Sequence, residues 1–146
     1  GWLAYNLSES ERKDAPDQSW RYFRHDQKHG LFAAAGWEHG TWTLGGRVRF
    51  ATGEPRTDVI GAFFDGRSGR FEPIRGPHNG VRLPAFFAAD VRGERHLPAG
   101  VTVYLEVQNL TNRANAEEII YSADFTQRGY LTSLPLLAIA GVRIER

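Results

Sequence analysis

The feature that most constrains this chain is the strict alternation of apolar and polar residues between Val101 and Gln108. Its apolar members are Val101, Val103, Leu105 and Val107, and the residues between them are Thr102, Tyr104, Glu106 and Gln108. A helix would bring every third or fourth residue onto one face, whereas a strand turns each successive side chain to the opposite face. The pattern therefore predicts a β-strand with one apolar and one polar side.

The same alternation recurs in five other segments, which lie at about residues 3–8, 31–37, 41–50, 87–94 and 136–145. Two of the connections between these six predicted strands are tight turns, at Glu38–Gly40 and His96–Gly100. The other three are long and run roughly over residues 9–26, 51–83 and 109–134. Structureless loops of that length are uncommon in compact soluble domains. The expected fold class is all-β and antiparallel.

Two architectures use strands with one apolar face: a soluble sandwich and a transmembrane barrel. Charged residues occupy the polar series of several predicted strands, and they suit either a wet barrel interior or a solvent-facing sheet; they are Arg47, Arg49, Asp90, Arg92, Glu94, Glu106 and Arg143. Strict alternation of short and long connections is typical of a transmembrane barrel, with turns on the periplasmic side and loops outside. The connections therefore favour the barrel, as a segment of about six strands.

Composition excludes several classes of function. The chain of 146 residues has no cysteine and a formal net charge of +1, which argues against disulfides, zinc–cysteine sites and nucleic-acid binding. No apolar run approaches the ~18 residues of a membrane helix, whereas a barrel strand needs only ~9–11 residues. The chain contains no methionine and opens on Gly1 and Trp2. We therefore expect it to be a processed product or a piece of a larger protein.

Several segments, in order, resemble the C-terminal part of TonB-dependent outer-membrane receptors. Val103–Asn112 is similar to the penultimate barrel strand running into an Asn-rich loop, and Leu134–Glu145 is similar to the closing strand. Further similar segments are Gly1–Ser8, Asp26–His29, Arg47–Pro55, Arg82–Phe86, Asn115–Glu118 and Tyr121–Arg128. Family members usually end on an aromatic residue, whereas this sequence ends on Arg146. The resemblance covers essentially the whole of residues 1–146 as one barrel segment.

The resemblance implies a place in the bacterial cell outer membrane and energised uptake of a scarce nutrient, such as an iron–siderophore or an oligosaccharide. The implied partners are membrane lipid, the remaining strands of a barrel of ~22 strands, a plug domain and the nutrient. The TonB complex is a further implied partner, and it would contact the plug domain through the TonB box of the plug. The seven charged residues named above would line the lumen. Val103, Leu105, Val107, Val142 and Ile144 would face lipid. No catalysis and no cofactor are implied.

The alternatives are a soluble β-sandwich or lipocalin-like binding module and a small standalone outer-membrane barrel. The standalone barrel would need two extra strands, which the long loops, for example Glu117–Asp124, would supply. His25 and His29 have the i, i+4 spacing of a helical metal pair, but they lie in a loop that enters a strand, so we predict no metal site. For the carboxylates Asp90, Glu94 and Glu106, we expect charge pairing with arginine rather than acid–base catalysis.

The long loops hold aromatic and arginine side chains, the usual anchors of recognition surfaces. Packing of these loops on themselves would use the same residue types. The candidate ligand-binding residues are Trp20, Arg24, Phe71, Arg75, His78, Tyr121, Phe125 and Arg128.

Overall fold

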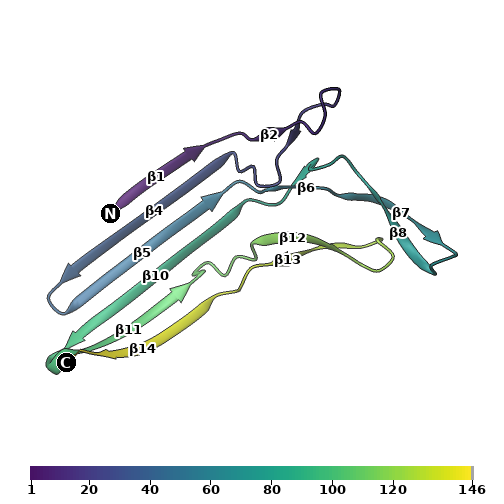
Figure 1. The fold of residues 1–146 in the computed structure, drawn as a ribbon. Helices are drawn as coiled ribbons and strands as arrows, with labels where there is room; N and C mark the ends of the chain where they lie inside the picture. The colour runs from purple at the N-terminus through teal and green to yellow at the C-terminus, as the bar shows by residue number, and fades with distance from the viewer. Residues whose placement is uncertain (146) are drawn as a thin grey trace.

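A computed structural model describes residues 1–145; Arg146, the position at which the resemblance predicts an aromatic residue, lies outside the described residues. Six antiparallel strands form one sheet in the order β1-β4-β5-β10-β11-β14 (Figure 1). Their bounds are Trp2–Leu7, His29–His39, Trp42–Ala51, Phe86–Leu97, Val101–Gln108 and Leu137–Ile144. Each strand lies beside the next one along the chain, so the predicted six strands and their antiparallel, all-β arrangement are confirmed. The sheet stays open, and no closed barrel forms within the described residues.

The three long connections, which the sequence predicted as loops, contain eight further strands. They contain four two-stranded sheets: β2 (Glu11–Arg12) with β3 (Arg21–Tyr22), β6 (Pro55–Arg56) with β9 (Val81–Arg82), β7 (Val59–Asp65) with β8 (Arg70–Arg75), and β12 (Ala116–Tyr121) with β13 (Arg128–Thr132). A strand does lie within Glu117–Asp124, but it pairs with β13 and does not extend the large sheet. Most of these strands are short or interrupted, so alternation could not reveal them.

The two ends of the sheet differ. The β4–β5 turn contains Gly40, whose φ of 58° is easily reached only without a Cβ atom. The β10–β11 turn is a short 3-10 segment, Pro98–Gly100, in which Ala99 and Gly100 also have positive φ. Figure 1 shows both tight turns at one end of the sheet and the two-stranded sheets at the other. The sheet is therefore a slab with a turn end and a loop end.

The strand registers place the predicted apolar series of different strands on one common face. Val91 lies opposite both Gly46 and Val107, and Val107 in turn lies opposite Ala138. On the other face, Arg47 lies opposite Asp90. A shift of one residue in any pair would have mixed the two faces. Each face is thus continuous across the sheet, one apolar and one charged.

The apolar face is uncovered. Among residues 1–145 only four apolar side chains are buried, those of Ala51, Pro55, Leu83 and Ala88. The accessible surface is 10266 Å², whereas a compact monomer of 16.4 kDa would expose about 7,500 Å². Leu105, Val142 and Ile144 each expose more than half of their surface. The described residues form a two-faced sheet with no second layer to enclose a core.

Candidate binding site at the loop end

All seven predicted lumen-lining residues lie on the charged face of the sheet and take part in two groups of ion pairs. In the first, the buried carboxylate of Asp90 accepts hydrogen bonds from Arg47 Nε at 2.6 Å and from the backbone N–H of Asn109 at 2.7 Å. Arg49 lies 3.7 Å from the same carboxylate. This group joins β5 and β10 to the start of the third long connection.

The second group lies nearer the turn end. Arg92 donates to Glu94 at 2.7 Å and to Glu106 at 2.9 Å, and Arg143 lies 3.8 Å from Glu94. The expectation that these carboxylates pair with arginine fits this geometry, since each is held by a guanidinium from its own or a neighbouring strand. A charge-paired face of this kind can meet water or another polar body.

The predicted loop residues fall into separate places. Arg24, Arg75 and His78 border one hollow, and His78 and Trp20 border a neighbouring one. Tyr121, Phe125 and Arg128 gather beside Asp58. Phe71 packs edge-to-face on Phe64, with ring centroids 5.4 Å apart, in the β7–β8 hairpin.

The hollow bordered by Arg24, Arg75 and His78 has a volume of about 400 Å³ and is where all three long connections meet. Its lining comes from β2, β3, β6, β8, β12 and the segments beside them: Arg12, Arg21, Phe23, Arg24, Arg56, Thr57, Arg75, His78, Asn79 and Glu118. Small-molecule sites are usually concave, with a few polar groups that fix the orientation of the ligand. We call these ten residues the arginine hollow.

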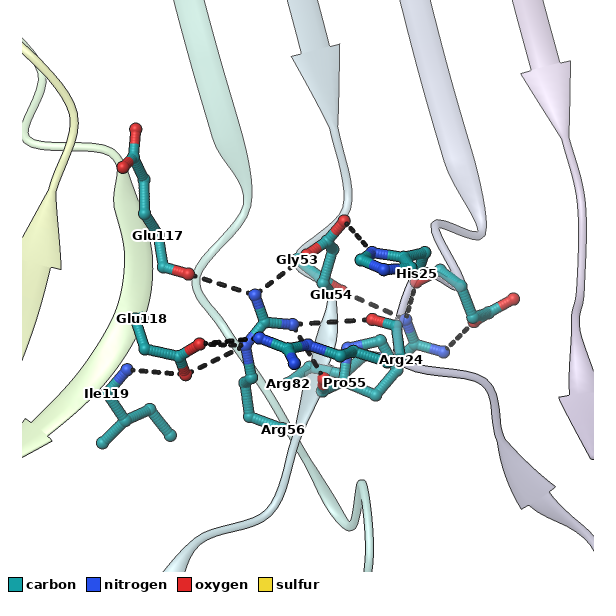
Figure 2. A network of polar contacts seen from close by, with 11 residues as sticks. Arg24, His25, Gly53, Glu54, Pro55, Arg56, Arg82, Glu117, Glu118 and Ile119 are labelled. Carbon is teal, nitrogen blue, oxygen red and sulfur yellow. Dashed lines mark hydrogen bonds and ion pairs between the residues drawn. The ribbon is translucent and has the colours of Figure 1, made fainter. Parts of the chain in front are cut away.

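Arg56, one of the residues that line the arginine hollow, lies at the centre of a network of polar contacts (Figure 2). Its side chain is only 10% exposed, and every nitrogen of its guanidinium donates to a protein acceptor at 3.0–3.5 Å. The acceptors are the carboxylates of Glu54 and Glu118 and the backbone carbonyls of Arg24, Pro55 and Glu117. Because these acceptors belong to all three connections, Arg56 ties the connections together.

A second buried ion pair supports the hollow from the side of the sheet. Asp26 is almost fully buried, accepts from the backbone N–H of Ser10 at 2.6 Å and pairs with Arg82. Arg82 also donates to the backbone carbonyls of Asp26 and Gly53 at 3.1 Å, and its guanidinium lies 4.7 Å from the ring centre of Tyr22. These contacts fix the first connection against the second.

The other arginines of the hollow make fewer hydrogen bonds to the protein than Arg56 does. Arg21 forms a two-pronged pair with Asp14, at 2.6 Å for each bond, and this pair holds the pKa of Asp14 below its ordinary value. Arg24 donates one hydrogen bond, from Nη2 to a carboxylate oxygen of Glu118 at 3.2 Å. Within residues 1–145, neither Arg12 nor Arg75 has a carboxylate within 4.0 Å; Arg12 lies over the ring of Phe23, 3.7 Å from its centre.

The Asp58 cluster joins the second connection to the third. Asp58 accepts from the Tyr121 hydroxyl and from Arg128 Nη1, the latter at 2.9 Å, and the backbone N–H of Val59 donates to Tyr121 at 3.0 Å. The hydrogen bond from Tyr121 and the charge of Arg128 lower the pKa of Asp58. Burial and the bond to Asp58 raise the pKa of Tyr121.

The two histidines at helical metal spacing do not act together. His25 Nδ1 lies 3.2 Å from Glu54, and His29 Nδ1 lies 2.7 Å from the Tyr5 hydroxyl. Across the described part of the chain, no three His, Asp or Glu side chains are grouped so as to hold a metal ion.

Sequence reasoning missed Arg12, Arg21, Arg56 and Glu118 as members of the hollow. Residues 9–26 and 51–83 together hold eight arginines and nine acidic residues, so the composition of these connections gave no signal. Their convergence depends on the pairing of Arg56 with Val81 in the β6–β9 ladder, which is only two residues long. No periodic pattern can show so short a ladder.

No protein-family model, curated protein or solved structure matches this chain. In the range 1–145, no helix is long and apolar enough to cross a membrane. The resemblance to TonB-dependent receptors thus rests on the sequence segments and stays a prediction.

Proposed function

We propose that this chain forms part of the wall of an outer-membrane β-barrel of the TonB-dependent receptor kind, and that the arginine hollow belongs to its outer ligand-binding surface. The observation that carries the proposal is the open sheet, whose one face is apolar and exposed while the other holds paired charges. In water such an apolar face would need a covering layer. In a bilayer, lipid covers it.

The spacing of aromatic residues on the apolar face supports a membrane setting. At the loop end, Phe50 lies opposite Phe87, and at the turn end Trp42 lies opposite His39. Phe50 lies eight positions after Trp42 in β5, a rise of about 26 Å at ~3.3 Å per residue. Outer-membrane barrels carry aromatic girdles on either side of an apolar band about 25 Å tall. The residues of β5 between them on this face are Leu44, Gly46 and Val48, all without charge.

Strand length and the edges also fit. β4, β5 and β10 have 11, 10 and 12 residues, enough to span the apolar core of a bilayer. The outer edges of β1 and β14 have no partner strand within residues 1–145. Unpaired edges cannot persist in lipid, so further strands, from the same chain or another, would pair there. The charged face would then meet the lumen and a plug domain.

The uptake role follows from the resemblance. A nutrient held at the outer loops would enter when energy from the TonB complex moves the plug. The chain itself would supply wall and loops and no catalytic group.

A charge placed on the apolar face tests the proposal. Leu105→Lys would put an ammonium group against lipid near mid-membrane, at a cost of about 2–4 kcal/mol, and should reduce the fraction of chain that stays with outer membranes after alkaline extraction. Leu137→Lys is the matched control, because Leu137 is also exposed but lies on the charged face. The membrane assignment would be wrong if the wild-type chain is monodisperse without detergent, or if both variants are lost from the membrane fraction to the same extent.

A further inference from the structure

We infer that the arginine hollow binds a small ligand that carries two or more oxyanion groups, carboxylate or phosphate. The inference rests on the proposed function, since it names the ligand class of the same loops. The resemblance allows both charged nutrients and neutral oligosaccharides as ligands. This inference selects the charged nutrients.

The first argument is the charge of the site. Five guanidinium groups line the hollow, from Arg12, Arg21, Arg24, Arg56 and Arg75. Three carboxylates pair with them, those of Asp14, Glu54 and Glu118. Two positive charges are therefore left over in a concave site, where the surrounding protein weakens screening by water. A ligand with two negative charges would neutralise them.

The second argument is the division of labour among the arginines. Arg56 is saturated by protein acceptors and acts as scaffold. Arg12 and Arg75 have no carboxylate partner among the described residues, so their forked N–H groups are available. Such forks bind carboxylate and phosphate through two parallel bonds. One oxyanion group for each of these two arginines matches the leftover charge.

The third argument concerns the alternative ligand. Sugars are commonly held by exposed aromatic faces together with neutral hydrogen-bonding groups. The hollow has one phenyl ring, Phe23, and the guanidinium of Arg12 already covers it at 3.7 Å. The stacking also holds the Arg12 guanidinium in place, so less conformational entropy is lost on binding. The site is thus prearranged for an anion rather than for a sugar ring.

The test uses citrate, inorganic phosphate and pyrophosphate as anionic probes and maltose as a neutral probe. Each is titrated calorimetrically at constant ionic strength into the full chain in a medium where the chain is monodisperse. Citrate should bind, more tightly than phosphate if the natural groups are carboxylates and less tightly than pyrophosphate if they are phosphates. Arg12→Gln and Arg75→Gln should each lower the affinity for the more tightly bound anionic probe at least about tenfold. Arg75→Lys, which keeps the charge and loses the fork, should be intermediate.

Arg70→Gln is the matched control, because Arg70 lies at the opposite end of β8 from Arg75. Its affinity should stay within twofold of the wild type. Equal weakening by Arg70→Gln would show diffuse charge attraction, and tight maltose binding without anion binding would show the wrong ligand class; either overturns the inference. Circular dichroism confirms that the variants fold. Anion binding by a chain that fails the extraction test would overturn only the membrane proposal, and extraction resistance without anion binding would overturn only the inference.

Discussion

The six-stranded sheet and the two-stranded sheets at its loop end are stabilised by different kinds of contact. In the sheet, neighbouring strands share ladders of six to ten paired residues, and each pairing follows from chain order. At the loop end, the β2–β3 and β6–β9 ladders have only two pairs each. Those short pairings are held instead by buried side chains such as Arg56 and Asp26. The comparison teaches that backbone hydrogen bonds hold the six-stranded sheet together, whereas contacts of a few charged side chains hold the candidate site together.

The largest expected effect comes from removing the scaffold arginine. Arg56→Met leaves Glu54 and Glu118 without their principal cation and frees several backbone carbonyls, which should destabilise the loop end by about 3 kcal/mol. The sheet should be unaffected, because none of its ladders depends on this side chain. Amide hydrogen exchange should therefore rise in β6, β9 and β12 and stay unchanged in β5 and β10.

Arg67→Met is the control for that variant, since Arg67 lies at the tip of the β7–β8 hairpin and only its backbone N–H is bonded there, to Asp65. It should change neither region. If exchange rose equally in β5 and β10 of Arg56→Met, the wall and the loop end would be one cooperative unit, and the comparison would fail.

The same contrast explains what the sequence could predict. The Val101–Gln108 alternation specifies a strand and its two faces, because side-chain period and burial are local properties. Chain order with tight turns then specifies the neighbours. The place of Arg56 could not be predicted, since its acceptors come from residues up to 62 positions away along the chain. Contacts made by single polar side chains over such separations leave no periodic trace.

An intermediate effect is expected at Asp58, which contributes a pH-dependent link between the second and third connections. Its pKa is lowered in the folded protein, so its contribution is present above about pH 4 and is lost as the pH falls below its ordinary value of 3.8. The pKa of Tyr121 is raised above 10.0, so its contribution is present below that pH and is lost as the pH rises further. The link should therefore hold between these limits.

Amide protection of β13 relative to β10, followed between pH 3 and 6, measures this link. Asp58→Asn should remove the pH dependence and cost about 1.5 kcal/mol of local stability, the scale of a hydrogen bond to a charged group. A pH dependence of the same size in Asp58→Asn would assign the titration to another group and remove Asp58 from the comparison.

The smallest expected effect tests whether single side-chain contacts contribute to the stability of the six-stranded sheet. The ring of Tyr104 lies over Gly141 on the charged face, where an added Cβ would come within 2.4 Å of its hydroxyl oxygen, and the Arg92 guanidinium lies 4.2 Å from the ring centre. Gly141→Ala would push the ring aside, and because a tyrosine ring can swing, the cost should be only about 1 kcal/mol. At Gly45, on the same face, an added Cβ meets nothing within 4 Å, so Gly45→Ala should be neutral or slightly stabilising. Urea unfolding midpoints of the two variants compare them directly. A loss in Gly141→Ala as large as that in Arg56→Met would mean that single side-chain contacts hold the wall as they hold the loop end.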